Sequence, residues 1–214
     1  MMTNKDVIVL LSGGLDSLAT VALLKDCYNI VMALHISYGQ KPSSKEVLAS
    51  KKICDYYGIK FEVVNLDWYE KISTNSALSS SNKDEKESYW MPNRNGLFLN
   101  IAASYADAIN CKYIAIGANK EEAEIFSDNS KEFIHKSTEL FKYSTQLKVE
   151  VIAPLINMAK KEIIEKIIEL NAPIEFVWSC YDNKNKHCGH CPSCEFLLKA
   201  LNDNNKKELI EKLF

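Results

Sequence analysis

The chain has 214 residues, of which 47% are hydrophobic and 25% charged, and its formal net charge is −2. These values are typical of a globular protein with one core, and the charge balance does not indicate a nucleic-acid partner. No apolar run reaches the roughly 20 residues of a membrane helix. The N-terminus also lacks the layout of a signal peptide, so we expect a cytoplasmic protein.

Three runs in the first third of the chain are typical of strands, and the first of them is continuously apolar and rich in β-branched residues, as expected for a strand buried on both faces of a parallel sheet. They are residues 6–11, 29–37 and 59–66. Helical periodicity fills both intervals, at residues 18–26 and 43–58. In the second helix Ser43 or Ser44 is the expected N-cap, and Gly58 follows the last turn. This alternation indicates a doubly wound α/β fold.

The alternation returns after a polar stretch. Residues 72–91 are rich in Ser, Asn and Lys, and we interpret them as a mobile loop or lid, with a structureless surface insertion as the alternative. Ser127 or Asp128 lies near the start of one of the later helices. The expected later helices are residues 96–110, 127–145 and 158–171, and the expected later strands are 112–118 and 149–155. The sequence therefore predicts a doubly wound, mainly parallel five-stranded sheet, with two short helical stretches beyond Pro173.

A small polar turn, SGGLDS, follows the first expected strand and runs from Ser12 to Ser17. A glycine-rich turn between strand and helix leaves backbone N–H groups unpaired at the positive end of the helix dipole, which is a site for phosphate. The turn has neither the lysine of a Walker motif nor the spacing of GxGxxG. Asp16 either holds the turn or helps to bind Mg²⁺; the alternative is an ordinary capped turn with Asp16 as N-cap.

The order of residues in this turn resembles the fingerprint of the ATP pyrophosphatase superfamily, whose members cleave ATP between the α and β phosphates to adenylate a substrate. The resemblance implies that the two glycines let the backbone approach the phosphates and that Ser12 and Ser17 donate hydrogen bonds. The residues it assigns to ATP are Leu11, Ser12, Gly13, Gly14, Leu15, Asp16, Ser17 and Leu18.

Four of the seven cysteines lie close together near the end of the chain. They are Cys180, Cys188, Cys191 and Cys194. The C-x2-C-x2-C spacing of the last three lets thiolates surround one ion, and four sulfurs suit a structural Zn²⁺. An iron–sulfur cluster is the first alternative and disulfides the last, while His187 and His190 stand beside the cysteines as substitute ligands. We expect the other cysteines to be buried thiols: Cys27, Cys54 and Cys111.

Further motifs along nearly the whole chain resemble those of the 7-cyano-7-deazaguanine synthase family. YGQ at residues 38–40 is similar to the family's F-[DN]-YGQ, and MPNRN at residues 91–95 is similar to P-G-R-N. APL at residues 153–155, with Lys160 beyond it, is similar to T-P-L followed by a lysine. CGHCPSC at residues 188–194 matches CGHC-x-x-C.

The resemblance implies an adenine nucleotide alpha hydrolase-like fold in two parts. Residues 1–172 would form the ATP pyrophosphatase-type α/β domain, and residues 173–214 a four-cysteine zinc-binding and helical segment on the same core. The resemblance also implies a homodimer with small-molecule substrates, and neither a nucleic acid nor a membrane as partner.

The activity that the resemblance implies is synthesis of 7-cyano-7-deazaguanine in queuosine biosynthesis. ATP, with Mg²⁺, adenylates the carboxylate of 7-carboxy-7-deazaguanine, ammonia displaces AMP to give an amide, and a second activation dehydrates the amide to the nitrile. The candidate catalytic residues are Ser12, Asp16, Ser17, Arg94 and Lys160. The candidate substrate-binding residues are Tyr38, Gln40, Arg94, Asn95, Glu122, Phe126 and Asp128.

One segment departs from the family pattern. Many members carry G-Y-P-D-C-R after the fourth strand, whereas this chain has EIFSDNS, with Phe126 at the tyrosine position and Ser130 at the arginine position. Asp128 keeps the aspartate, and Glu122 lies where those members have another aspartate. We expect Glu122 and Asp128 to read the guanine-like edge of the substrate, because a carboxylate accepts from both N1–H and the exocyclic amine.

Other interpretations of these residues and of the chain stay open at this stage. Arg94 either contacts the phosphates or the substrate carboxylate, or only braces its loop. Lys160 and Lys161 either cap the active site or only lie on the surface of a helix. The two acids at positions 122 and 128 either bind substrate or belong to a solvated face. A paralogous enzyme that transfers an adenylated deazaguanine or acyl group to a protein is the main rival function. A non-catalytic nucleotide-binding module is the second.

Overall fold

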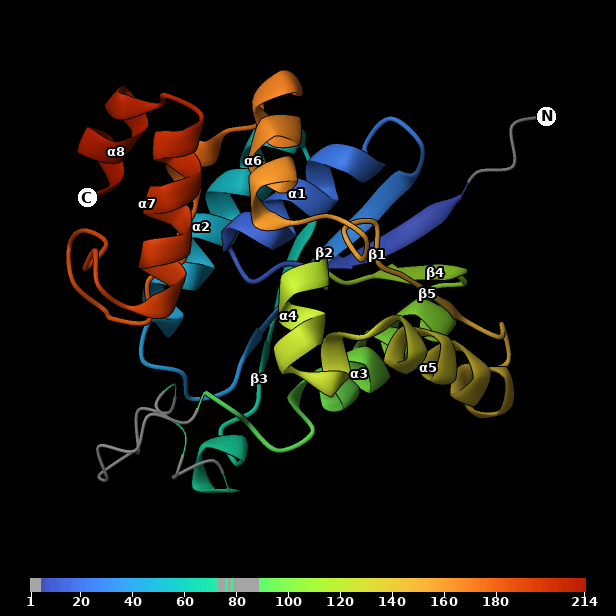
Figure 1. The fold of residues 1–214 in the computed structure, drawn as a ribbon. Coiled ribbons are helices and arrows are strands. Elements are labelled where there is room, and N and C mark those ends of the chain that lie inside the picture. Colours follow the sequence, from blue (N-terminus) through green and yellow to red (C-terminus); the bar gives the residue numbers. More distant parts are fainter. Residues whose placement is uncertain (1–4, 73–75, 77, 79–88) are drawn as a thin grey trace.

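Five parallel strands form one sheet at the centre of the molecule (Figure 1). The computed structural model describes residues 5–72, 76, 78 and 89–214. The strands are β1 (Asp6–Leu10), β2 (Asn29–Ser37), β3 (Phe61–Asn65), β4 (Tyr113–Ala115) and β5 (Glu150–Ile152). Their order in the sheet is β3-β2-β1-β4-β5, and all four pairs are parallel. The chain therefore winds outward from β1 in both directions, as the sequence predicts for a doubly wound fold.

Helices cover both faces of the sheet (Figure 1). One face carries α1, α2 and α6 with α7 and α8 beyond them, and the other carries α3 and α5. The helices are α1 (Leu15–Leu24), α2 (Ser43–Tyr57), α3 (Arg94–Ala108), α4 (Lys120–Ile125), α5 (Lys131–Ser144), α6 (Lys160–Glu169), α7 (Pro192–Asp203) and α8 (Lys207–Leu213). Short 3-10 turns occupy Tyr69–Ile72, Ser127–Asn129 and Ile174–Phe176.

The two faces of β1 belong to two separate hydrophobic cores. Val7 and Val9 pack into the cluster on the α1 side, and Ile8 and Leu10 pack into the cluster on the α3 side. Successive residues of a strand point to opposite faces, so a central strand buried on both sides has to be apolar throughout. This is the physical reason for the uninterrupted apolar run in β1.

Several local expectations need correction. Pro42, not Ser43 or Ser44, is the N-cap residue of α2, and the Ser43 hydroxyl instead bonds that of Ser37 at 2.8 Å. The fifth helix begins at Lys131, because the Ser130 hydroxyl accepts from the N–H of Phe133 and caps it. The short helix α4 was not expected from the sequence.

Burial also differs from expectation at one cysteine. Cys54 and Cys111 are buried as expected, whereas Cys27 is exposed. Most of the expected loop at residues 72–91 lies outside the described residues. In the described part of the chain, no helix combines the length and the apolar character needed to cross a bilayer.

The C-terminal segment packs on the α/β core. Leu197, Leu201 and Leu213 lie in the same hydrophobic cluster as Val7 and Val9 of the central strand. The first two belong to α7, which packs against α6, and α8 packs against α7 in turn. The C-terminal helices thus pack on the same face of the sheet as Val7 and Val9 of β1.

Candidate active site

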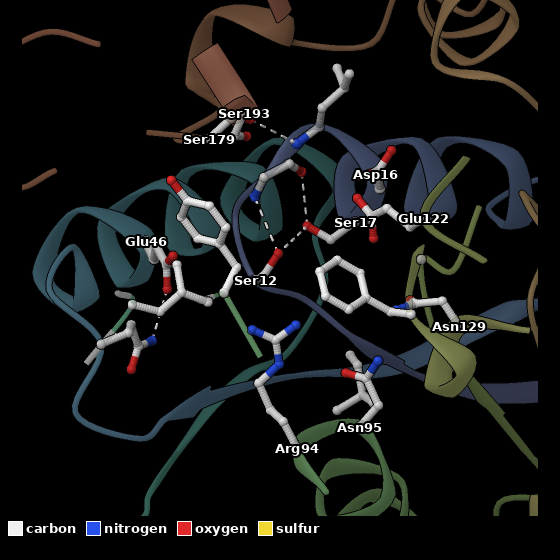
Figure 2. Close-up of a pocket in the computed structure, with 18 of the residues that line it drawn as sticks. Ser12, Asp16, Ser17, Glu46, Arg94, Asn95, Glu122, Asn129, Ser179 and Ser193 are labelled. Carbon is white, nitrogen blue, oxygen red and sulfur yellow. Dashed lines mark hydrogen bonds between the residues drawn. The ribbon is translucent and has the colours of Figure 1, made fainter. Parts of the chain in front are cut away.

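A cavity of about 420 Å³ lies beyond the carboxyl ends of β1 and β2, where open α/β sheets place their ligands. In Figure 2 the turn and the start of α1 form one wall, and Arg94 and Asn95 rise from α3 opposite. The sequence-predicted residues that line the cavity are Leu11, Ser12, Gly14, Leu15, Asp16, Ser17, Tyr38, Gln40, Arg94, Asn95, Glu122, Phe126, Asp128 and Lys160. Two others face elsewhere, since Gly13 lies against α2 and Leu18 is fully buried in the core.

The turn from Ser12 to Ser17 has a backbone that requires glycine. Gly13 has φ +84°, and a Cβ there would lie 2.6 Å from the carbonyl oxygen of Glu46. Gly14 is the N-cap residue of α1, so Asp16 does not cap this helix and lies within its first turn. This geometry overturns the interpretation of an ordinary turn capped by Asp16.

Hydroxyl groups surround the N-terminus of α1 (Figure 2). The N–H of Gly14 points at the Ser12 hydroxyl, 3.4 Å away, and the N–H of Leu15 points at the Ser179 hydroxyl, 3.3 Å away. The Ser17 hydroxyl donates to the Gly14 carbonyl at 2.9 Å. Long contacts of this kind leave the helix N-terminus available to an anion, which it favours through its dipole.

Three charged side chains meet beside the turn. The ammonium of Lys160, the first residue of α6, contacts Oδ2 of Asp16 and lies 3.0 Å from Oε1 of Glu122. Among the residues that the structure describes, the second oxygen of Asp16 is buried and has no hydrogen-bond partner. Lys161 is exposed and faces Glu165 at 3.8 Å, so of the two adjacent lysines only Lys160 reaches the cavity.

Burial and charge oppose each other within this cluster. Burial raises the pKa of Asp16 to about 6, and the neighbouring Lys160 ammonium offsets part of this effect. Burial alone would lower the pKa of Lys160, but the carboxylates of Asp16 and Glu122 outweigh it and raise that pKa. Lys160 is therefore held as a cation at the edge of the turn.

A second polar group lines the wall at the end of β2. Arg94 Nη1 lies 3.4 Å from the Tyr38 hydroxyl, and the guanidinium carbon is 6.0 Å from the centre of the Tyr38 ring. The Gln40 side chain accepts from the N–H of Tyr38 at 2.8 Å and donates to Oε2 of Glu46 at 2.8 Å. Sequence reasoning missed Glu46, because an acidic residue in the first turn of a helix is ordinary.

The segment that departs from the family pattern forms the opposite rim. Phe126 stacks on Trp90, with ring centres 6.4 Å apart and planes 24° apart. Asn95 donates to the backbone carbonyl of Asp128 at 3.2 Å and so fixes this stretch against α3. The carboxylate of Asp128 is not among the partners of Lys160, whereas that of Glu122 is. The two acids that we expected to act together thus lie in different surroundings.

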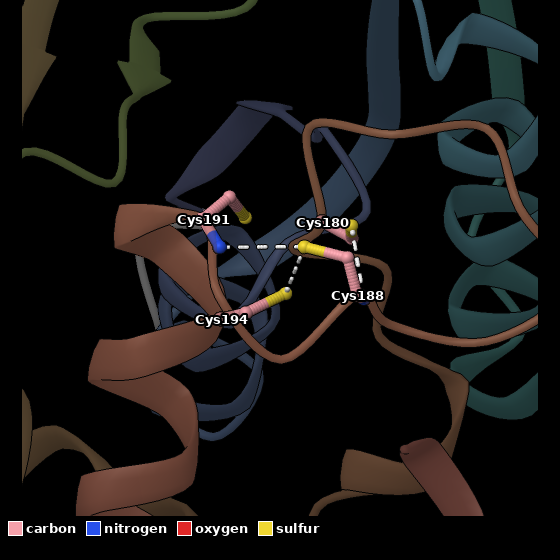
Figure 3. Close-up of side chains that lie close together, drawn as sticks. All are labelled: Cys180, Cys188, Cys191 and Cys194. Atoms are coloured by element: carbon pink, nitrogen blue, oxygen red, sulfur yellow. Dashed lines mark hydrogen bonds between the residues drawn. The ribbon is translucent and has the colours of Figure 1, made fainter.

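The four cysteines form one cluster that could hold a metal ion (Figure 3). The sulfurs of Cys180, Cys188, Cys191 and Cys194 all lie within 4.8 Å of one another, and those of Cys188 and Cys194 are 3.8 Å apart. Backbone N–H groups of Cys188 and Asp182 point at the sulfur of Cys180, and such bonds support thiolate ligands. His187 and His190 do not belong to the cluster, since both have backbone carbonyl partners instead.

The cysteine segment also builds one wall of the cavity. The lining includes Trp178, Ser179, Tyr181 and Ser193, which flank or separate the cysteines. The N–H of Trp178 donates to the carbonyl of Gly13 at 2.8 Å, so the segment is joined directly to the glycine turn. The sequence signal for these residues was weak, because nothing but their closeness to the cysteines sets them apart.

A doubly wound parallel sheet whose first strand runs into an SGGxDS turn defines the PP-loop class of nucleotide-binding proteins. Solved structures agree on the fold. The U34-tRNA thiolase NcsA of Methanococcus maripaludis, with its [4Fe-4S] cluster, matches with a TM-score of 0.54 and 22% identity over 98% of this chain and 69% of the thiolase. An NH3-dependent NAD synthetase of Campylobacter jejuni matches with a TM-score of 0.51 and 18% identity over 98% of this chain and 79% of the synthetase.

Sequence relatives define the family within this class. The model of the queuosine biosynthesis protein QueC matches residues 6–205. A 7-cyano-7-deazaguanine synthase of Carboxydothermus hydrogenoformans is 43% identical over 92% of this chain and 98% of the relative. Another, from Methanosarcina barkeri, is 38% identical over 96% of this chain and 98% of the relative. The chain belongs to the QueC family.

Proposed function

We propose that this protein is an ATP-dependent ligase that makes 7-cyano-7-deazaguanine from 7-carboxy-7-deazaguanine and ammonia. The observation that carries the chemistry is the single cavity in which the turn from Ser12 to Ser17 faces Arg94 and Lys160. An anion cradle and two cations around one space suit a reaction that expels pyrophosphate from ATP. The substrate is inferred from the name that the family's members carry.

On the turn side, the backbone N–H groups at the start of α1 and the hydroxyls of Ser12 and Ser17 bind the phosphates that leave. Lys160 neutralises the charge that develops on pyrophosphate, which is why its buried ammonium stands beside the turn. Asp16 and Glu122 offer the carboxylate oxygens that Mg²⁺ prefers, and one Asp16 oxygen is buried without a partner among the described residues. When bound, Mg²⁺ would compensate phosphate charge.

On the opposite side, the substrate lies between the wall at β2 and the aromatic rim. Arg94 has the planar fork that matches a carboxylate, and it orients the group to be activated. Phe126 and Trp90 present flat faces to a fused heteroaromatic ring. Of the two acids expected to read the guanine-like edge, Asp128 is the better candidate, because Glu122 is committed to Lys160.

The proposed reaction has two activations that use the same groups. A carboxylate oxygen attacks the α phosphorus of ATP and releases pyrophosphate, and ammonia then displaces AMP from the acyl carbon to leave an amide. The amide oxygen is adenylated by a second ATP with release of pyrophosphate, and loss of AMP and of both protons of the amide nitrogen leaves the nitrile. Ammonia is the nucleophile that forms the carbon–nitrogen bond, so a covalent cysteine is not required.

We propose that the four-cysteine cluster holds a structural Zn²⁺. A tetrahedral ion with Zn–S bonds of about 2.3 Å separates its sulfurs by roughly 3.8 Å, and the Cys188–Cys194 pair has this spacing. An iron–sulfur cluster spreads its ligands over several irons and needs a wider arrangement. Four protein ligands leave no open position, so the ion would support the fold rather than bind substrate. Metal analysis of the purified protein distinguishes zinc from iron.

The homodimer and the absence of a nucleic-acid partner stay predictions. Light scattering coupled to size-exclusion chromatography measures the mass of the particle in solution. Filter binding with bulk tRNA tests the second prediction. A particle of monomer mass, or tRNA retained at physiological salt, would contradict the corresponding prediction.

The first experiment is mass spectrometry of a reaction that contains the purified protein, ATP, Mg²⁺, ammonium and 7-carboxy-7-deazaguanine. We expect nitrile, AMP and pyrophosphate, with two AMP formed for each nitrile. Release of neither AMP nor pyrophosphate would leave a non-catalytic nucleotide-binding module as the better description.

One alternative function is favoured by a specific observation. The rim around Phe126 and Ser130 departs from the common family pattern, and a paralogue with the same ATP and cysteine sites would transfer its adenylated deazaguanine to a protein amine. In the same experiment such an enzyme would form AMP without nitrile. Phe126→Tyr is the informative variant, because it restores the common residue without changing the ring.

A further inference from the structure

A continuous chain of hydrogen bonds joins the C-terminus of the protein to the glycine turn. His187 lies between the two ends, with its backbone N–H 3.0 Å and its Nδ1 3.2 Å from the carbonyl oxygen of Leu213. Its Nε2 lies 3.1 Å from the backbone N–H of Ser179. The Ser179 hydroxyl in turn accepts from the N–H of Leu15, the first residue of α1, at 3.3 Å. Two residues, His187 and Ser179, therefore link Leu213 to Leu15 at the proposed phosphate site.

The partners of His187 determine its tautomer. A carbonyl oxygen has no proton to give, so Nδ1 donates to Leu213, and Nε2 is then the acceptor for Ser179. His187 is 5% exposed, and its ring lies between Trp178 and Phe214, with ring centres 4.8 and 5.1 Å away. Both nitrogens are thus occupied, and the ring has no freedom to turn toward the cysteines.

The same segment holds the turn from its other side. Trp178 donates its backbone N–H to the Gly13 carbonyl at 2.8 Å, while Ser179 accepts from Leu15. The two segments are 164 positions apart in the sequence at the second contact. Ser179 immediately precedes Cys180, and His187 immediately precedes Cys188. Both residues of the bridge are therefore direct sequence neighbours of cysteines in the cluster.

We propose that Ser179 and His187 are positioning residues that couple the four-cysteine site to the ATP site. Resting on the proposed function, the inference adds that a metal bound by the cysteines strengthens binding of the ATP triphosphate by ordering the SGGLDS turn. A turn that is already ordered loses less conformational entropy when it binds phosphate. Without the bridge, α1 presents the same N–H groups in a looser arrangement.

The primary test measures binding of α,β-methylene-ATP with Mg²⁺ to the full-length, metal-loaded protein by calorimetry. Ser179→Ala removes the acceptor of Leu15, and we expect its Kd to rise about three- to tenfold, as for loss of one hydrogen bond. Ser179→Thr keeps the hydroxyl and is expected to restore most of the affinity. Tighter binding by Ser179→Ala would mean that the hydroxyl competes with phosphate and would overturn the proposal.

A matched control is available in the same segment. The Ser44 hydroxyl contacts Asn183 at 3.3 Å, between the first two cysteines, and it does not line the cavity. Ser44→Ala therefore removes a hydroxyl contact to the cysteine segment without touching the turn. We expect its Kd and its metal content to match the wild type. An equal loss of affinity in Ser44→Ala and Ser179→Ala would overturn the proposal, because it would show that any lost contact to the cysteine segment weakens nucleotide binding.

The coupling itself is tested by a cycle that combines Ser179→Ala with metal removal by a chelator. If the bridge carries the effect, metal removal weakens nucleotide binding several-fold in the wild type and clearly less in Ser179→Ala. Equal fold-changes in both proteins would show that the two sites act independently. Where metal removal unfolds the chain, His187→Gln replaces it in the cycle, since its amide oxygen can still accept from Ser179 while the Nδ1 contact with Leu213 is lost and the backbone contact stays.

Hydrogen exchange of the backbone amides in residues 12–18 gives a readout that does not depend on nucleotide. We expect faster exchange in Ser179→Ala and after metal removal, with unchanged exchange in the strands. A wild type that fails to bind the nucleotide would refute the proposed function, while exchange would still decide whether the bridge orders the turn. Unchanged exchange in Ser179→Ala would refute the bridge alone.

Discussion

Two adjacent lysines of α6 lie in very different surroundings, although they are one position apart. Lys160 is enclosed by Asp16 and Glu122, with 14% of its side chain exposed, whereas 63% of the Lys161 side chain is exposed. The two side chains have the same charge and length, so in the sequence only the resemblance to the family motif separates them. The side of α6 on which each lysine lies separates a site residue from a surface residue.

Replacing these lysines gives the first prediction. Lys160→Met removes the cation expected to neutralise the departing pyrophosphate, and we expect kcat to fall by about 10²–10³-fold. Lys161→Met changes the same charge one residue away, and we expect kcat within about twofold of the wild type. Steady-state assays of pyrophosphate release measure both. A Lys160→Met enzyme with more than a tenth of the wild-type kcat would contradict the assignment.

Glu46 gives a second prediction, based on pH. Burial raises its pKa from 4.5 to about 7, although the Gln40 hydrogen bond and the Arg94 charge oppose the shift. A raised pKa in the folded state means that ionisation of Glu46 costs stability as the pH rises through 4.5 to 7. Glu46→Gln has no such cost and keeps an oxygen for Gln40. We expect the stability of Glu46→Gln relative to the wild type to increase as the pH rises, by on the order of 3 kcal/mol between pH 4 and pH 8.

Urea denaturation at a series of pH values measures this difference in the free energy of unfolding. The expected curve for the difference is flat below about pH 4, rises through the titration range and levels above about pH 8. A difference that is independent of pH would mean that Glu46 is as well solvated in the folded chain as in the unfolded one.

At the scale of elements, the turn between β1 and α1 imposes a strict local requirement for glycine. Gly13 and Gly58 both have a positive φ, +84° and +68°, so both backbones disfavour an L side chain. They differ in space, because a Cβ at Gly13 would meet the Glu46 carbonyl at 2.6 Å, whereas one at Gly58 meets nothing within 4 Å. The same substitution at the two sites separates backbone strain from steric exclusion.

The third prediction compares Gly13→Ala with Gly58→Ala. Gly58→Ala is expected to cost about 1 kcal/mol of stability and to leave nucleotide binding unchanged, since the end of α2 lies away from the cavity. Gly13→Ala adds the clash with α2, so we expect a larger loss of stability and loss of measurable nucleotide binding. Thermal unfolding and calorimetry with α,β-methylene-ATP give the two quantities. Equal effects at both sites would refute the role assigned to the turn.

At the scale of the whole molecule, the first strand and the last two helices share one hydrophobic core. Leu201 of α7 is fully buried in the cluster that contains Val7 and Val9 of β1. We therefore propose that the α/β part and the C-terminal cysteine segment unfold as one cooperative unit, since neither keeps its core without the other. This proposal keeps the predicted arrangement, in which the cysteine segment of residues 173–214 lies on the same core as the α/β part.

Cooperative unfolding is the fourth prediction. Tryptophan fluorescence and far-ultraviolet circular dichroism should give coincident urea transitions for the metal-loaded protein. Leu201→Ala is expected to lower the free energy of that single transition by about 2–5 kcal/mol. Leu140→Ala, on an exposed position of α5, is the control and should change it by no more than about 0.5 kcal/mol. Two separate transitions would show that the segment folds as its own domain.

The sequence by itself determined the doubly wound sheet, the position of the anion-binding turn and the four-cysteine cluster. Each of these is encoded in neighbouring residues: an apolar run with its period, two adjacent glycines, and cysteines at fixed spacing. The cap of α2 and the start of α5 were misplaced, because several adjacent polar residues suit such a boundary and packing selects one. Most of the site residues that the sequence motifs singled out do line the cavity.

Only the tertiary structure decided which of those residues act on one another. It assigned Glu122 to Lys160, added Glu46 to the wall, and placed Ser179 against the turn. The contacts at Lys160 and Ser179 span 38 and 164 positions, so no local pattern records them. These contacts form because the strand order and the packing of the C-terminal helices bring distant segments together. Burial then sets the charge and the chemistry of the side chains that meet there.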